Sequence, residues 1–129
     1  MAFQRTFTGT PWEEKVGYCR ALRAGDRVLV TGTTALNDDG SVHSPGDSYE
    51  QTVKCFEIIA KALSDLGASM RHVVRTRMYV TDISQWEDIG RAHGEIFRAH
   101  PPCATMVEVK GLVDPAMLIE IEAEAVVED

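Results

Sequence analysis

A strict two-residue alternation runs through residues 117–127 and constrains the fold more than any other feature. One set of positions is apolar and comprises Met117, Ile119, Ile121, Ala123, Ala125 and Val127. The positions between them carry Leu118, Val126 and three glutamates, Glu120, Glu122 and Glu124. Successive side chains of a strand point to opposite faces, so the segment predicts a strand with one face in the core. Its other face presents carboxylates and must meet either water or a partner subunit.

The other patterns predict a mixed sheet covered by helices on one face. Further strands are expected over residues 3–8, 18–23, 27–35, 72–81 and 103–112. Two long helices are expected to open with the capping boxes Ser48-x-x-Gln and Ser84-x-x-Glu, and a short one with Thr10-Pro-Trp-Glu. Gly67 suits the position just after the first long helix. The expected fold is α+β, with about six strands and two helices on one face, in a single domain over 1–129.

The strand over 72–81 carries charges that match the glutamates of the last strand. Arg75 and Arg77 are expected on one face together with Val73 and Tyr79. The other face is expected to carry Val74, Thr76, Met78 and Val80. If the two strands are neighbours, the arginines can pair with the glutamates. The charged face is then either a solvated surface or a subunit interface that keeps charged groups for a site.

Charge and composition exclude several classes of protein. The 129 residues include 13 Lys or Arg and 20 Asp or Glu, which gives a net charge of −7 and opposes binding to polyanions. No apolar run approaches the roughly 20 residues that cross a bilayer, and residues 1–10 lack the apolar stretch of a secretory signal. Three cysteines cannot all pair and are typical of reduced thiols. We expect a cytoplasmic protein that binds neither nucleic acid nor membrane.

One metal motif is incomplete. His93-Gly-Glu95 followed by Pro102-Cys103 is similar to the signature of zinc nucleobase deaminases, but Met106 stands where the second cysteine belongs. A thioether does not replace a thiolate on zinc, so we expect no metal site. His93 is then expected on a helix surface and Cys103 as a buried structural thiol.

Two residues of the predicted strands are candidates for a site. Gly32 interrupts a strand, which marks either a simple bulge or a close approach of the backbone to a ligand. Glu120 lies on a mostly apolar strand beside Leu118. It is either a partly desolvated carboxyl suited to acid–base chemistry or an ion-paired surface glutamate.

Taken in order, five segments are similar to the RidA family, also called YjgF/YER057c/UK114. They are Gly17-Tyr-Cys-Arg-Ala21, Val28-Leu-Val-Thr-Gly-Thr33, Val74 to Asp82, Pro102 to Val109, and Leu112 through Ile119-Glu-Ile-Glu-Ala123. The resemblance covers nearly the whole chain, and the ending Met-Leu-Ile-Glu-Ile-Glu-Ala is its most specific part.

The resemblance implies a fold like the trimeric bacterial chorismate mutases. Three subunits would pack their sheets around a central barrel, with small-molecule sites in the clefts between subunits. The family activity that it implies is the hydrolysis of reactive enamines and imines to ketoacids and ammonia, without metal or cofactor.

The resemblance also implies a set of site residues. Glu120 matches the glutamate that positions the attacking water. Tyr18 and the backbone of Thr31 and Gly32 match groups that hold the substrate, and Trp86 matches an aromatic at the pocket edge. Met106 falls where a cysteine often stands in the deaminase branch, and Cys103 lies in the same segment.

The arginine that binds the substrate carboxylate does not carry over. Its position, four residues before the glutamate of Val107-Glu-Val109, holds Ala104. Loss of a bidentate charged contact at a desolvated site costs about 2–5 kcal/mol. Arg20 either supplies a replacement charge or is a strand arginine facing solvent. We expect a subgroup outside the deaminase branch that hydrolyses an imine, enamine or related C–N metabolite, or else a non-catalytic metabolite-binding trimer or scaffold.

Overall fold

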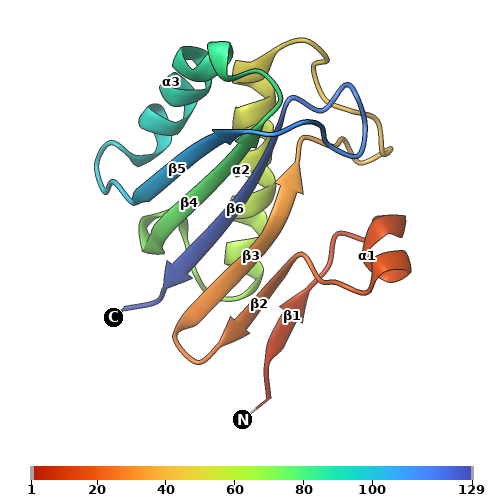
Figure 1. Cartoon of the computed structure of the whole chain (residues 1–129). Coiled ribbons are helices and arrows are strands. Elements are labelled where there is room, and N and C mark those ends of the chain that lie inside the picture. Colours follow the sequence, from red (N-terminus) through yellow and green to blue (C-terminus); the bar gives the residue numbers. More distant parts are fainter. Residues whose placement is uncertain (1, 129) are drawn as a thin grey trace.

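The computed structural model describes residues 2–128; Met1 and Asp129, the ends of the expected 1–129 domain, lie outside the described residues. Figure 1 shows one sheet with helices packed against it. Its strands are β1 (Gln4–Thr6), β2 (Ala21–Ala24), β3 (Arg27–Thr34), β4 (Val73–Val80), β5 (Cys103–Glu108) and β6 (Ile119–Val126). The helices are α1 (Pro11–Val16), α2 (Ser48–Asp65) and α3 (Trp86–Phe97), with 3₁₀ turns η1 (Met70–His72) and η2 (Ile83–Gln85).

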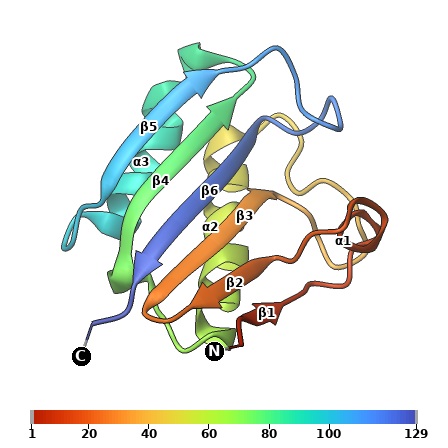
Figure 2. The same ribbon diagram turned by 60° about the horizontal axis from the view of Figure 1, so that its bottom comes forward.

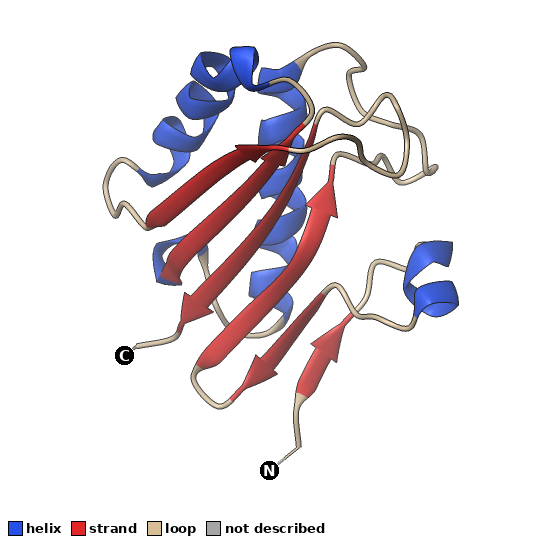
Figure 3. Cartoon of the chain, in the orientation of Figure 1, coloured by secondary structure: helices blue, strands red, loops and turns tan. Residues whose placement is uncertain are grey.

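The sheet order is β1-β2-β3-β6-β4-β5. Only β4 and β5 are parallel among the described pairs, and the other neighbours are antiparallel, so the sheet is mixed. Helices α2 and α3 lie side by side on one face, while the opposite face is left open in the chain (Figures 2 and 3). The predicted α+β architecture of six strands with two helices on one face is confirmed.

Strand β6 holds the centre of the sheet, between β3 and β4. Its residues alternate between buried and half-buried along the whole strand, as the sequence pattern predicts. On the open face Arg77 Nη1 lies 3.2 Å from Glu124 Oε1, and Arg75 Nε lies 4.0 Å from Glu124 Oε2. The predicted pairing of arginines and glutamates is therefore confirmed.

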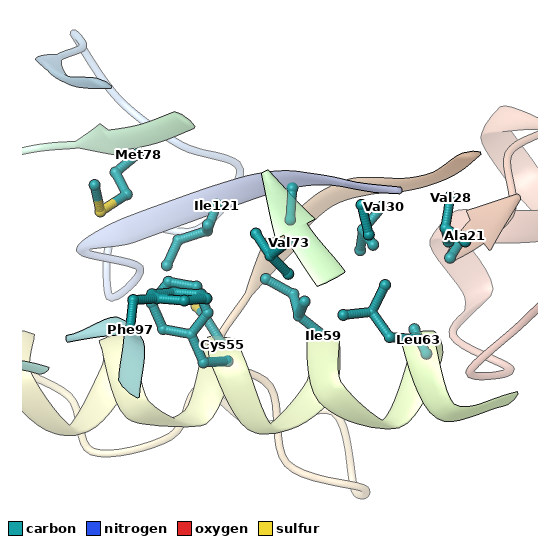
Figure 4. Packing of buried hydrophobic residues seen from close by; sticks show 14 of the residues in the cluster. Ala21, Val28, Val30, Cys55, Ile59, Leu63, Val73, Met78, Phe97 and Ile121 are labelled. Carbon is teal, nitrogen blue, oxygen red and sulfur yellow. The ribbon is translucent and has the colours of Figure 1, made fainter. Parts of the chain in front are cut away.

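The core lies between the sheet and α2. Figure 4 shows Cys55, Ile59 and Leu63 of α2 directed at the sheet, where Val28, Val30 and Ile121 face them. Phe97, from the end of α3, closes the same layer. The apolar halves of the alternating strands thus form this layer, and their polar halves remain on the open face.

The two long helical segments begin one or two residues before their predicted capping boxes. The N-cap of α2 is Asp47, whose carboxylate accepts from the Glu50 N–H at 3.0 Å, and Ser48 is the first helical residue. Asp82 caps η2 in the same way, 3.0 Å from the Ser84 N–H. An aspartate in each case takes the role expected of the serine. The end of α2 is as predicted: Gly67 has φ +77° and its N–H donates to Ser64 O.

A register shift at the start of β4 changes which valine is buried. The sequence pattern predicts that Val74 shares a face with Thr76 and that Val73 lies on the other, but the ladder to β6 slips between Val73 and Arg75. Val73 is therefore buried and Val74 is 44% exposed. An extra residue in one strand reverses the side-chain alternation on one side of it, which period-two counting cannot detect.

Two predicted environments are wrong. His93 turns toward the core, where Nε2 lies 2.9 Å from Thr76 Oγ1 and the ring packs beside Phe56 and Phe97. Burial lowers the pKa of His93. Cys103 was expected to be buried, but it begins the edge strand β5 and is exposed in the chain.

Among residues 2–128, no helix is both long and apolar enough to cross a membrane.

Candidate functional site

A cavity of about 600 Å³ lies between α1, the end of β3 and the start of β6. Its lining includes Tyr18, Arg20, Gly32 and Glu120, four of the residues singled out in the sequence. A second hollow of about 340 Å³ opens on the other side of Gly32 and Glu120 and is lined by Tyr79, Gly111 and Leu112 among others. Glu120 thus stands between two hollows.

Because Gly32 has no side chain, the Glu120 carboxylate can lie against the backbone of β3. The ladder between β3 and β6 shifts between Val30 and Thr33, so Gly32 sits in a bulge. A Cβ built on Gly32 would lie 2.1 Å from Glu120 Oε2, closer than non-bonded atoms approach. The neighbouring Thr31 Oγ1 donates to Cys19 O at 2.7 Å and ties the bulge to the segment before β2. The bulge therefore serves a close approach, and the approaching group is the protein's own glutamate.

Glu120 is half-buried, and its carboxylate has no hydrogen-bond or ion-pair partner within residues 2–128. Its neighbours on the same strand differ, because Glu122 accepts from Tyr79 Oη and Glu124 from Arg77 Nη1. Burial raises the pKa of Glu120, the charge of Glu122 adds to the rise, and Arg20 opposes it. This environment corresponds to the desolvated carboxyl of the two sequence alternatives.

A buried glutamine fixes the entry to β6. Gln51, on α2, is fully buried; its Nε2 donates to Ala116 O at 2.9 Å, and its Oε1 accepts from the Leu118 N–H at 2.9 Å. One side chain thereby satisfies the backbone on both sides of Met117. Gln51 therefore fixes the backbone two residues before Glu120.

Arg20 is buried, with 7% of its surface exposed, rather than facing solvent. Its Nη1 donates to Gly32 O at 3.1 Å and to Thr33 Oγ1 at 3.0 Å, while Nε lies 3.3 Å from Glu13 Oε2. The guanidinium carbon is 5.6 Å from the centre of the Tyr18 ring. Arg20 thus holds together the bulge of β3, Tyr18 and helix α1.

Glu13 was predicted to close a capping box with Thr10, but the Thr10 side chain makes no cap bond. The Glu13 carboxylate instead accepts from the Thr8 hydroxyl and from the N–H groups of Thr8 and Gly9, at 3.0 Å and 3.1 Å. Burial works against the charged carboxylate, but these hydrogen bonds and Arg20 outweigh it and lower the pKa of Glu13.

The buried ion pair between Glu13 and Arg20 makes the stability of the protein depend on pH. A carboxyl with a depressed folded pKa stabilises above its unfolded value, here 4.5, and the stabilisation is lost as pH falls through the folded value. We expect Glu13→Gln to lower the free energy of unfolding at pH 7 by about 3 kcal/mol, the low end for a broken buried pair because glutamine keeps one acceptor. The difference from the native protein should shrink as pH falls below 4.5. Urea unfolding at several pH values measures it.

The matched control for this prediction is Glu14→Gln, on the next residue of α1, whose side chain is exposed. It should change the unfolding free energy by no more than about 0.5 kcal/mol at any pH. Equal effects of the two substitutions would contradict a special role for Glu13.

Four residues of the predicted site lie apart from the cavity in the single chain. Trp86 begins α3 and is 56% exposed. Cys103, Ala104 and Met106 lie on β5, where Ala104 pairs with Thr76 of β4. None of these four is among the residues lining the two hollows described. They can join Glu120 only across a subunit boundary.

The cavity contains groups that sequence reasoning missed. Trp12 lines its wall from α1, and Glu13, outside the lining, pairs with the lining residue Arg20. Gln51 was recognised only as part of a capping box. The run Trp12-Glu13 before Gly17-Tyr18 carried a usable signal, since a short helix with an acidic residue directly precedes the tyrosine of the site.

A mixed sheet backed by two helices, with a bulge glycine against a glutamate of the central strand, defines a two-layer α+β protein with a candidate site at that bulge. A family model described as endoribonuclease L-PSP matches residues 11–127. The chain belongs to this family, which is also named YjgF/YER057c/UK114. The resemblance found in the sequence is confirmed.

Relatives support the same assignment over nearly the full chain. A crystal structure of Rv2704 from Mycobacterium tuberculosis, described as a member of that family, has a TM-score of 0.89 and 41% identity, covering 98% of this chain and 100% of that one. An uncharacterized protein of Streptomyces coelicolor is 40% identical over 96% of this chain and 92% of its own. The 3-aminoacrylate deaminase RutC of Acinetobacter baylyi is 33% identical over 84% and 85%.

Proposed function

We propose that the protein is a cofactor-independent hydrolase of an imine, an enamine or a related small C–N metabolite other than the usual amino-acid-derived imine. One observation carries the proposal: the Glu120 carboxyl is half-buried, has no partner among the described residues and faces a cavity beside Gly32. A carboxyl that ends in a cavity with a raised pKa is suited to exchange protons with water and substrate. The similarity to a relative named 3-aminoacrylate deaminase supports the same chemistry.

In the proposed reaction Glu120 orients a water molecule against the electrophilic carbon of the C=N group. As the water oxygen bonds to that carbon, Glu120 takes a proton from the water and passes it to the imine nitrogen, which gives a neutral carbinolamine and restores the carboxylate. Glu120 then takes the remaining hydroxyl proton and delivers it to the amine nitrogen as the C–N bond breaks with its electron pair leaving on nitrogen, so that ammonia departs and Glu120 is again ionised. Imine and water thus give a carbonyl compound and ammonia. Tyr18 and the backbone at Thr31 and Gly32 hold the substrate.

We also propose a cytoplasmic homotrimer that packs the open sheet faces around a common axis, with ligands in the clefts between subunits. The open face carries apolar side chains, Leu29 and Val107, that are 43% and 42% exposed in the chain and lie on β3 and β5, on either side of the charged strands β6 and β4. An interface of this mixed character covers both kinds of group. Sedimentation equilibrium should give three times the 14.2 kDa of one chain, and a monomer at micromolar concentration would contradict it.

Ala104 determines which imines are poor substrates. We expect the native protein to act slowly on the imine that an amino-acid oxidase forms from alanine, because position 104 carries no guanidinium to bind the carboxylate. Ala104→Arg should raise kcat/KM for this imine at least tenfold, measured by ammonia release. The substituted side chain can act on this substrate only if position 104 lies near Glu120 of a neighbouring subunit. Such a gain would therefore also support the trimer. A fast native protein would contradict this interpretation of Ala104 and assign the carboxylate to Arg20.

A non-catalytic metabolite-binding trimer or scaffold is the second candidate, and Ala104 favours it, because the family's substrate anchor is absent. Turnover and ligand binding measured on Glu120→Gln separate the hydrolase from the binding protein. RNA cleavage is not our proposal despite the family's descriptive name, because a net charge of −7 opposes phosphate binding. Copurification of RNA with the protein at moderate salt would contradict this.

A further inference from the structure

We infer that the cavity beside Glu120 takes an apolar, preferably aromatic ligand that bears an amine or imine nitrogen and no carboxylate. The inference rests on the proposed function for the reaction and adds the substrate class. Three observations support it. Arg20 is already engaged by protein groups, the other charges that line the cavity are negative, and α1 supplies an apolar wall.

Arg20 is the one cationic side chain among the cavity's described lining residues, and the protein already occupies it. Its Nη1 donates to Gly32 O and Thr33 Oγ1, and its charge is paired with the Glu13 carboxylate. Its side chain is 8% exposed. A ligand carboxylate would have to compete with Glu13 for a guanidinium that scarcely reaches the cavity surface, so Arg20 is structural here rather than an anion receptor.

The other charges that line the cavity are negative. Asp38 and Asp39 lie in the loop at its mouth, and Glu120 lies at its inner end. The Asp39 carboxylate is held in place by the Ser41 N–H at 2.9 Å and by the Ser41 hydroxyl at 2.6 Å. With Glu13 and Arg20 cancelling each other, the remaining potential favours a protonated amine or iminium and repels a carboxylate.

The wall facing these charges is apolar and exposed. Trp12 and Val16 of α1 are 42% and 71% exposed, and Val113, from the segment before β6, is 69% exposed. Large apolar groups that line a concave surface are typical of ligand sites. A cavity of about 600 Å³ is in the range of drug-sized ligands and exceeds what a three-carbon imine fills. The ring of an aromatic amine or imine would lie against Trp12, with its nitrogen toward Glu120.

Binding of two probes of similar size and opposite charge tests the ligand class without requiring turnover. Calorimetry on the full-length protein at low salt should show benzylammonium binding at least tenfold more tightly than benzoate, with butylammonium weaker than benzylammonium. Trp12→Ala should weaken benzylammonium about five- to tenfold, as expected for loss of an aromatic contact. Phe3→Ala is the matched control, because Phe3 is 55% exposed and lies outside the cavity lining; it should leave the affinity unchanged.

Turnover gives the second, separate readout. A flavin amine oxidase forms the imine of benzaldehyde from benzylamine, and an amino-acid oxidase forms the carboxylate-bearing imine of phenylalanine. Ammonia release should be accelerated at least tenfold more for the first imine than for the second. If the ammonium probes bind as expected but neither imine is hydrolysed, the ligand class stands and the proposed hydrolase activity fails.

Three results would overturn the inference whatever the activity. The first is that benzoate binds as tightly as benzylammonium, which would make Arg20 the anion receptor. The second is that neither probe binds at millimolar concentration. The third is that Trp12→Ala has no more effect than Phe3→Ala, which would remove α1 from the site.

Discussion

Glu120→Gln is expected to lower kcat for imine hydrolysis by about a hundred- to ten-thousandfold, the usual contribution of a general acid–base group. Glutamine has nearly the shape of glutamate and fits the space left by Gly32, so affinity for a neutral ligand should change little, whereas an ammonium probe should bind more weakly because one negative charge is lost. It cannot take a proton from water, so the chemical step alone should fail. Steady-state ammonia release and calorimetry on the same preparation separate the two effects. Full activity of the variant would remove Glu120 from the mechanism, and a complete absence of native turnover would favour the binding-protein alternative.

The same substitution should leave the protein as stable or make it more stable at pH 7. Burial and Glu122 raise the folded pKa of Glu120, so its ionised form costs stability, starting near the unfolded value of 4.5 and reaching the full cost above the folded pKa. Glutamine removes that cost, and the gain over the native protein should therefore appear as pH rises above 4.5. Loss of activity together with equal or higher Tm is characteristic of a residue kept for function.

Glu124→Gln provides the matched control on the same strand and face. Its carboxylate is paired with Arg77 at 3.2 Å and does not line either hollow. Activity should stay within twofold of the native value, and stability should fall by at most about 1 kcal/mol, as for a partly exposed ion pair. If both glutamine variants lost activity equally, the effect would belong to the charge of the whole face rather than to Glu120.

The architecture was predictable because it rests on long, regular patterns. Residues 117–127 alternate without interruption, and the structure forms β6 from residues 119–126 of that segment, at the centre of the sheet with the same faces in and out. The helical spacing that ends at Gly67 is similarly uninterrupted. Each pattern sums the burial of many apolar groups, so no single local contact can reverse it.

The errors fall where one hydrogen bond or one extra residue decides the outcome. Asp47 and Ser48 are both good N-caps, and their sequence does not say which one adopts the extended backbone before α2. The slip at Val73 adds one residue to a strand whose neighbouring residues have similar polarity. Such choices differ by about 1 kcal/mol and are settled by tertiary contacts.

The site was predictable only where family resemblance or an anomalous residue marked it. Gly32 in a strand and Glu120 on an apolar strand each departed from the pattern around them, and the structure places them in contact. In the sequence Arg20 resembled a surface charge and Glu13 a capping residue, because their burial depends on the tertiary contact between α1 and the segment before β2. Seven positions separate them, and no local rule relates a helix residue to a strand residue at that distance.

Gly32→Ala is expected to lower activity strongly and to change stability only slightly. A substitution in the core would mainly lower stability. The added Cβ would meet Glu120 Oε2 at 2.1 Å, with Cδ and Cγ at 3.1 Å and 3.3 Å. The carboxylate is the far end of a flexible side chain, so it can rotate away while the backbone stays in place. We expect kcat/KM to fall about ten- to a hundredfold, or roughly 1.4–2.7 kcal/mol of lost transition-state stabilisation, while Tm changes by only a few degrees.

Gly90→Ala is the control that makes this prediction specific to Gly32. Gly90 lies within α3, where an added Cβ meets no atom within 4 Å, so alanine should stabilise the helix by about 0.5–1 kcal/mol and leave kcat/KM unchanged. If Gly32→Ala remained as active as Gly90→Ala, the position that Glu120 takes against the bulge would not be the reactive one. If Gly32→Ala unfolded the protein, the bulge would be a folding requirement rather than a device that positions the carboxylate. The expected outcome, a folded protein with a displaced Glu120, would explain why this strand keeps a glycine that costs it conformational entropy.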